Sequence, residues 1–191
     1  MYIKVIKVFI ISIFLYSCSQ TQKETENKEN ISNDSMLKRG EYLVTIMACA
    51  DCHSPKMKTD QGFVPDPDLT LSGHPSHKQL KDIDTSLTRT WAIFSKEGTA
   101  SAGPWGVSYA ANITSDPTGI GGWTQEQFNR AMKQGKYKGI EKARTLQPPM
   151  PWPSFAVLTE EDLKAIFTFL KSTKPVRNVP PDSKSRKDIN K

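Results

Sequence analysis

"MACADCHSPK", Met47 to Lys56, places two thiols and an imidazole within five residues. Cys49 and Cys52 are three positions apart, and His53 follows the second cysteine directly. From composition alone, the pattern Cys-x-x-Cys-His arises by chance in roughly one in a thousand chains of this length. These three side chains are therefore the first candidates for a functional site.

One interpretation of this pattern is a c-type haem attachment site. The two thiols form thioether bonds to the two vinyl groups of haem, which lie on adjacent edges of the ring. Cysteines one helical turn apart reach both vinyl groups, and a histidine after the second cysteine then lies beneath the iron as an axial ligand. On this interpretation Cys49 and Cys52 bind the cofactor, and His53 is the proximal iron ligand.

Two other interpretations use the same residues. A thioredoxin-like redox pair belongs on the turn after a strand, whereas an apolar helical pattern precedes Cys49. A structural zinc site needs four ligands, and the adjacent Cys52 and His53 cannot easily chelate one tetrahedral ion together. The further imidazoles, His74 and His77, lie in a proline-rich loop. The haem interpretation meets neither objection.

Outward from the motif, the chain predicts three helices joined by long loops. The first runs from Met36 to Cys49, with apolar side chains at helical spacing. Residues 54–112 are rich in turn formers, with short strands or extended loops expected within 88–114. The second and third helices are expected within 123–135 and 158–172. Three helices joined by long loops are too little regular structure to bury a core of this size by themselves. We therefore expect a large apolar group, such as haem, at the centre of the fold.

The second and third helices carry clear end signals. Thr124 and Gln127 form a capping box for the second, and Gly135 can end it. Thr159 caps the third, and acidic residues fill its first turn. The expected buried faces are Phe128, Ala131 and Met132 in the second helix and Leu163, Ile166, Phe167 and Leu170 in the third.

The N-terminal segment has the pattern of an export signal. Lys4 and Lys7 precede the apolar run Val8–Tyr16, and Cys18 follows where a cleavage site is expected. This resembles a bacterial lipoprotein signal, in which residues 1–17 are removed and Cys18 receives lipid. The alternative is an ordinary signal peptide or an uncleaved anchor. Residues 18–35 carry almost no apolar side chain and are expected to be a flexible tether.

Charge adds little to the assignment of function. The formal net charge is +6, and from Lys171 onward the chain has seven Lys and Arg residues against two Asp residues. We expect residues 180–191 to be a basic, disordered tail, with the folded domain spanning residues 36–179. Because the protein is expected to be exported, nucleic acid is not an expected partner.

A second axial ligand is expected opposite His53. Met150 lies in "LQPPMPWP", where prolines stiffen the chain and can hold a thioether in place with little loss of entropy. It is far downstream, so the chain can first wrap the ring. His74 or His77 is the alternative ligand. Filled axial positions favour electron transfer over catalysis, and a thioether raises the redox potential.

With these motifs in place, the chain resembles a bacterial class I cytochrome c domain from Arg39 to about Val179. The matching segments are "RGEYLV", "CADCH", "GPWGVSYAANIT", "TGIGGWTQEQFNRAMKQG", "PPMPW" and "LTEEDLKAIFTFLKS". The resemblance implies a mostly α fold with three main helices, long loops and short strands near 90–115, around one covalent haem c. It is similar to cytochrome c subunits of membrane-associated dehydrogenases.

The resemblance also implies roles for single residues. Gly40 would allow the first and last helices to cross at Phe167 or Phe169, and the carbonyl of Pro65 would orient His53. Three further residues are expected in the haem pocket: Asn112, Trp123 and Trp152.

The expected function is therefore single-electron transfer between redox proteins, such as a dehydrogenase and a terminal oxidase, rather than enzymatic catalysis. The protein is expected to be lipid-anchored to a bacterial membrane and to face the periplasm. The alternative is a small haem peroxidase or gas-binding sensor with an open sixth position.

Overall fold

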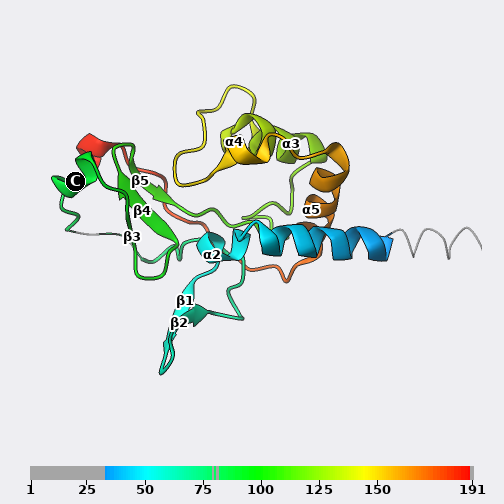
Figure 1. Cartoon of the computed structure of the whole chain (residues 1–191), viewed down its shortest axis with the longest axis horizontal. Coiled ribbons are helices and arrows are strands. Elements are labelled where there is room, and N and C mark those ends of the chain that lie inside the picture. Colours follow the sequence, from blue (N-terminus) through cyan, green and yellow to red (C-terminus); the bar gives the residue numbers. More distant parts are fainter. Residues whose placement is uncertain (1–32, 79, 81, 190–191) are drawn as a thin grey trace, which may run out of the picture.

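The computed structural model describes residues 33–78, 80 and 82–189 (Figure 1). The predicted signal, the lipidation site Cys18 and most of the predicted tether lie outside these residues. Within the described residues, no helix is both long and apolar enough to cross a membrane. The three main helices are those of residues 33–46, α3 (Gln125–Gln134) and α5 (Glu160–Ser172), which confirms the mostly α architecture.

The first helix differs from the prediction at both ends. It already includes residues 33–35, which were assigned to the tether, and it ends at residue 46 rather than at Cys49. Ala48 has a left-handed backbone, with φ of 54°, and this breaks the helix. A separate short helix, α2 (Cys49–His53), then begins. The Cys-x-x-Cys-His motif therefore lies on a short helix of its own, separated from the first helix by the break at Ala48.

The end signals of the other two main helices are confirmed. Thr124 and Gln127 form a capping box on α3, and Gly135 ends it in the left-handed conformation. The Thr159 side chain accepts a hydrogen bond from the Asp162 N–H at the start of α5. A further short helix, α4 (Trp152–Phe155), follows directly after Met150 and Pro151.

The main core forms where the three helices meet. Leu163, Ala165, Ile166 and Leu170 of α5 are almost fully buried. Phe167 stacks on Phe128 of α3 with ring centroids 5.1 Å apart. The buried members of this core are Leu43, Val44, Leu71, Ile120, Phe128, Met132, Leu163, Ala165, Ile166 and Leu170.

Gly40 marks the crossing of the first helix and α5. A Cβ atom at this position would lie 2.6 Å from the Cβ of Phe169 and would also collide with the Ala165 carbonyl. Only glycine lets the two backbones approach this closely. The predicted crossing is therefore confirmed, with Phe169 rather than Phe167 beside the glycine.

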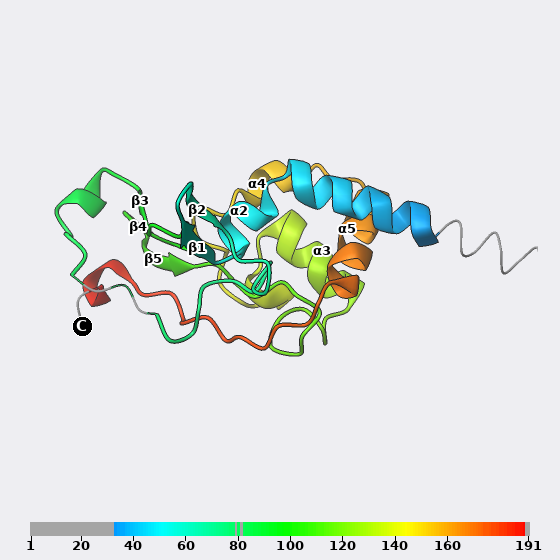
Figure 2. The same ribbon diagram turned by 90° about the horizontal axis from the view of Figure 1, so that it is seen from below.

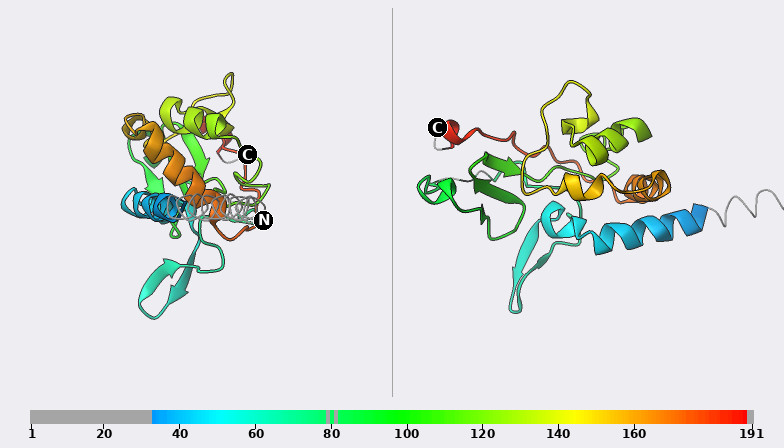
Figure 3. Two further views of the ribbon diagram at one scale, coloured as in Figure 1. Left: turned by 90° about the vertical axis from the view of Figure 1, so that its right-hand side faces the viewer. Right: turned by 45° about the horizontal axis from the view of Figure 1, so that its top comes forward.

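The region between the first helix and α3 holds two small antiparallel sheets. β3 (Ile93–Phe94), β4 (Ala100–Gly103) and β5 (Gly106–Tyr109) pair in that order, as expected for short strands near 90–115. The hairpin of β1 (Lys56–Thr59) and β2 (Gly62–Pro65) was not predicted. It projects from the body of the molecule (Figure 3). Short 3-10 helices are η1 (Leu87–Arg89), η2 (Tyr137–Gly139) and η3 (Arg186–Asp188).

The C-terminal segment corrects the prediction of a disordered tail. After α5 the chain runs along the molecule to the three-stranded sheet (Figure 2). The backbones of Lys184 and Val107 exchange two hydrogen bonds, of 2.9 and 3.0 Å. Ile189 is 3% exposed and completes a second apolar cluster with Ile83, Ala102 and Val107. The folded domain therefore extends beyond residue 179.

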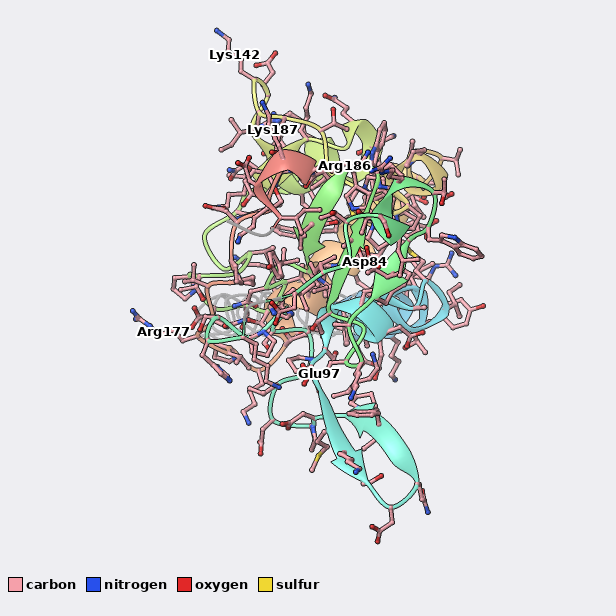
Figure 4. The ribbon with its side chains drawn as sticks, turned by 90° about the vertical axis from the view of Figure 1, so that its left-hand side faces the viewer. Asp84, Glu97, Lys142, Arg177, Arg186 and Lys187 are labelled. Carbon is pink, nitrogen blue, oxygen red and sulfur yellow. The ribbon has the colours of Figure 1, made fainter. Side chains whose placement is uncertain are left out.

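The basic side chains explain why the tail was misassigned. Arg186 and Lys187 lie on the C-terminal turn and are exposed to solvent (Figure 4). Composition reports this charge, whereas the placement of the segment depends on the backbone pairing at Lys184 and on one apolar side chain, Ile189.

Candidate haem-attachment site

The two cysteines of the candidate site, Cys49 and Cys52, both lie on α2. Both are free cysteines and both are partly buried. Their spacing on one short helix places the two sulfurs one helical turn apart, which is the arrangement that two adjacent vinyl groups require. Cys49 also packs against the main core.

The environment of the thiols opposes a redox-pair interpretation. Burial raises the pKa of Cys49 to about 11. Burial also raises the pKa of Cys52, while the positive charge of Lys56 acts in the opposite direction. Thiols that exchange disulfides have a lowered pKa because the thiolate is the nucleophile. The local fold also differs from the strand–turn–helix context of such a pair, since the first helix precedes α2.

His53 is oriented by the backbone carbonyl of Ala111. Its Nδ1 lies 2.7 Å from the Ala111 oxygen. Because a carbonyl only accepts, Nδ1 carries the proton, and the lone pair of Nε2 is left for a ligand bond. Burial lowers the pKa of His53, and the hydrogen bond to Ala111 partly opposes this. The imidazole is thus held neutral, as metal ligation requires.

This contact corrects the assignment of Pro65 as the residue that orients the histidine. Pro65 is exposed on β2, where it pairs with Lys56. The site instead depends on segment 110–113, which crosses the segment around Gly73. Gly73 N–H donates to the His53 carbonyl over 2.7 Å, and Ile113 N–H donates to the Leu71 carbonyl over 2.9 Å.

Ala111 and Gly73 were both missed by sequence reasoning. Ala111 acts through its backbone, which leaves no signature in the side-chain pattern. Gly73 has φ of +77°, and a Cβ there would lie 2.6 Å from the Ala111 oxygen. The turn-forming run "SGHP" was the available signal, because a glycine at a turn often permits a positive φ or a close approach.

Met150 lies on the loop that leads into α4. It is partly buried and packs against the same core cluster as Cys49. Its N–H donates to the Gln147 carbonyl over 3.3 Å, which closes a turn over the two prolines between them. The fold therefore brings a thioether and the attachment helix to one apolar core, although they are about a hundred residues apart.

His74 is not available as the alternative axial ligand. It is 2% exposed, and its Nδ1 lies 2.9 Å from the Thr99 hydroxyl. Its Nε2 lies 2.8 Å from the Lys78 carbonyl. Both ring nitrogens are used within the protein, so this alternative was wrong. His77 is exposed on the surface.

The three predicted pocket residues occupy different surroundings. Asn112 is 5% exposed, and its amide donates to the carbonyls of Val176 and Asn178 over 2.8 and 3.1 Å. It thus joins the segment that orients His53 to the chain after α5. Trp152 lies beside Gly135 at the end of α3, and Trp123 packs against the main core. A role of these residues in a haem pocket stays a prediction.

The chemistry of the donor set fits haem c better than a metal ion alone. Among the residues that the structure describes, no group of three or more His, Cys, Asp or Glu side chains is placed to hold a metal ion. What the fold offers is two thiols at attachment spacing, one imidazole with a free Nε2, and a thioether on the same apolar core. Partly buried apolar side chains, among them Met47, Ala50 and Ile113, pack around that core, as a porphyrin face requires.

Comparisons with known proteins agree with this chemistry. The chain is 32% identical over 154 residues to the gluconate 2-dehydrogenase cytochrome c subunit of Pantoea cypripedii, and the match covers 80% of this chain and 26% of the relative. It is 31% identical over 156 residues to the cytochrome c subunit of the quinone alcohol dehydrogenase of Gluconobacter oxydans, covering 79% and 25%. It is also 38% identical over 82 residues to the fructose dehydrogenase cytochrome subunit of Gluconobacter japonicus, covering 41% and 16%.

The chain thus spans about a quarter of the length of the first two relatives. The cytochrome c family model matches residues 37–174, which include the attachment helix, the Met150 loop and nearly all of the three main helices. With the thiol pair, the oriented histidine and this match, the protein belongs to the cytochrome c family.

Proposed function

We propose that this protein is an electron carrier with one haem c, held by Cys49 and Cys52 and ligated by His53 and Met150. The observation that carries the proposal is the hydrogen bond from His53 Nδ1 to the Ala111 carbonyl, 2.7 Å long. It presents Nε2 as a ligand directly after two free thiols on one turn of helix. Membership of the cytochrome c family supports covalent haem c, and the single family match supports one haem.

Haem c, when bound, supplies a one-electron iron couple. The residues of this chain would hold it and set its surroundings. The Cys49 and Cys52 thiols would add across the vinyl groups, so that each sulfur gains a bond to carbon and each thiol proton moves to the other vinyl carbon. His53, kept neutral and oriented by Ala111, would ligate on one face. Met150 would ligate on the other face and favour the ferrous state.

Electron transfer is favoured over catalysis because this ligand pair would leave no open position on the iron. The alternative, a small haem peroxidase or gas-binding sensor, needs an open or labile sixth position. His74 is buried, and both of its ring nitrogens are hydrogen-bonded within the protein, so it offers no free nitrogen to act as a catalytic base.

The names of the relatives suggest the electron donor. Two of them are cytochrome c subunits, of a gluconate 2-dehydrogenase and of a quinone alcohol dehydrogenase. We infer that this protein accepts electrons from a membrane-associated dehydrogenase and passes them to an acceptor such as a terminal oxidase. A lipid on Cys18 would hold it at a bacterial membrane, facing the periplasm.

The first test is spectroscopic. The full chain, produced with c-type haem attachment machinery, should give the pyridine haemochrome spectrum of haem bound through two thioethers. The Met150→Ala variant should then lose the far-red absorption band of the sulfur–iron bond, and its redox potential should fall. Met132→Ala is the control, because Met132 is buried in the core on α3.

Carbon monoxide separates the two candidate functions. The ferrous wild-type protein should not bind carbon monoxide at neutral pH, whereas Met150→Ala should bind it. Binding by the wild type would favour the peroxidase or sensor. An unchanged far-red band in Met150→Ala would exclude Met150 as the ligand. A pyridine haemochrome spectrum that showed no covalently bound haem in the wild type would refute the proposal as a whole.

A further inference from the structure

The three-stranded sheet contacts the loop that carries Met150. Ser108 of β5 lies with its hydroxyl oxygen 2.5 Å from the carbonyl oxygen of Pro148, forty residues along the chain. Gln147 adds a second link, since its Nε2 donates to the Trp105 carbonyl over 3.4 Å. Both contacts reach the loop just before Met150, from the end of the β4–β5 hairpin.

The Ser108 hydroxyl is aimed at the loop by its neighbour. The indole N–H of Trp105 donates to the Ser108 hydroxyl oxygen over 3.0 Å. An indole nitrogen can only donate, so the hydroxyl accepts from Trp105 and its own proton goes to the Pro148 carbonyl. Trp105 is itself placed by Gly103, because a Cβ at that position would lie 2.5 Å from the indole ring.

The hairpin is anchored independently of the loop. Ser108 pairs in register with Ser101 of β4. On the other side of β5, Val107 exchanges two backbone hydrogen bonds with Lys184 of the C-terminal segment. The loop has its own anchor at its start, where Leu146 N–H donates to the Gly135 carbonyl over 2.6 Å. Ser108 therefore holds the part of the loop nearest Met150 against a fixed support.

We propose that Ser108, oriented by Trp105, is a positioning residue that holds Met150 on the haem iron. This inference rests on the proposed function, in which Met150 is the distal ligand. A neutral thioether competes with other ligands for the iron, so part of its occupancy comes from a loop that keeps it in place. The hydrogen bond to the Pro148 carbonyl has to break when the loop carries Met150 away from the iron, so it opposes loss of the ligand.

The test measures how readily imidazole displaces Met150 in the ferric holoprotein. A net hydrogen bond contributes about 0.5–1.5 kcal/mol, which corresponds to roughly a 2- to 10-fold change in an equilibrium constant. Ser108→Ala should therefore bind imidazole about 2- to 10-fold more tightly and show a weaker far-red band. Ser108→Thr keeps the hydroxyl on a residue that suits a strand, and should behave as the wild type. Trp105→Phe should shift in the same direction as Ser108→Ala.

Ser95→Ala is the matched control. Its hydroxyl, directly after β3 of the same sheet, accepts a hydrogen bond from the Ala100 N–H of β4 over 3.2 Å. If Ser95→Ala increased imidazole affinity as much as Ser108→Ala, general loosening of the sheet would explain the effect and the proposal would fail. A Ser108→Ala variant with wild-type imidazole affinity and an unchanged band would also overturn it. A wild type without the far-red band would instead refute Met150 as ligand, and with it both proposals.

Discussion

At the scale of single residues, the site depends on a backbone carbonyl. His53 is aimed by Ala111, and Ala111 reaches it because Gly73 leaves room for the crossing segment. The two cysteines and the histidine are predicted from local spacing alone, because haem attachment would require that spacing. The prediction that Pro65 supplies the carbonyl that orients His53 was wrong. Any residue can supply a backbone carbonyl, and only the fold decides which one lies beside the histidine.

We expect Gly73→Ala to disturb the site as well as the fold. The positive φ costs about 1–3 kcal/mol for alanine, and the new Cβ also pushes against the Ala111 carbonyl. A weaker hydrogen bond makes His53 a less basic ligand, so the redox potential of the holoprotein should rise. Thermal unfolding and potentiometric titration give the two quantities.

Gly62→Ala is the control for backbone strain. Gly62 has φ of +111°, but among the described residues no atom outside Gly62 and its two chain neighbours lies within 4 Å of where its Cβ would be. It should lose stability and keep the wild-type potential. If Gly73→Ala also kept that potential, Gly73 would have no part in placing the Ala111 carbonyl.

At the scale of elements, the helices were predictable and the hairpin was not. The capping box of α3 and the cap of α5 each depend on a few adjacent residues, and the buried residues of both helices repeat with the helical period. The break at Ala48 has no such signal, since alanine favours a helix. The β1–β2 hairpin was not predicted, because its strands are only four residues long and mostly exposed, so they lack a clear alternation of apolar and polar residues.

The crossing of the first helix with α5 yields a second prediction. Gly40→Ala should destabilise the protein by about 1–3 kcal/mol, because the added methyl group overlaps the backbone at Ala165 and the Phe169 side chain. Alanine would otherwise favour a helix by about 1 kcal/mol over glycine, so a loss of stability isolates the packing effect. Urea unfolding measures it.

Gly122→Ala provides the comparison, because in the part of the chain that the structure describes no atom beyond its chain neighbours lies within 4 Å of its Cβ position. Its unfolding midpoint should stay close to that of the wild type. A stabilised Gly40→Ala variant would show that the helices can separate at the crossing without cost.

At the scale of the whole molecule, the segment after α5 ties distant parts together. Asn178 donates to the carbonyls of Ser72 and His74 over 2.7 and 2.9 Å, beside the Gly73 crossing. Farther on, Lys184 pairs with β5, the strand that carries Ser108. One segment thus supports the histidine side of the site and, through the sheet, the methionine loop.

A third prediction concerns the end of this segment. Ile189→Ala should release the tail, at a cost of about 2 kcal/mol, the low end for a buried isoleucine because the chain end can loosen locally. Trypsin should then cleave faster after Arg186 and Lys187, which mass spectrometry can follow. Val179→Ala, with Val179 64% exposed, should cleave at the wild-type rate. Equal rates for both variants would mean that Ile189 does not hold the tail.

The sequence by itself determined the attachment motif, the three main helices and the candidate distal methionine, because each depends on neighbouring residues or on a helical repeat. The tertiary structure alone decided which carbonyl orients His53, why His74 cannot serve as a ligand, and where the C-terminal segment lies. These depend on contacts between residues far apart in the chain, which are made by backbone groups and single buried side chains. Such contacts leave little trace in composition or periodicity, so they become visible only when the chain is folded.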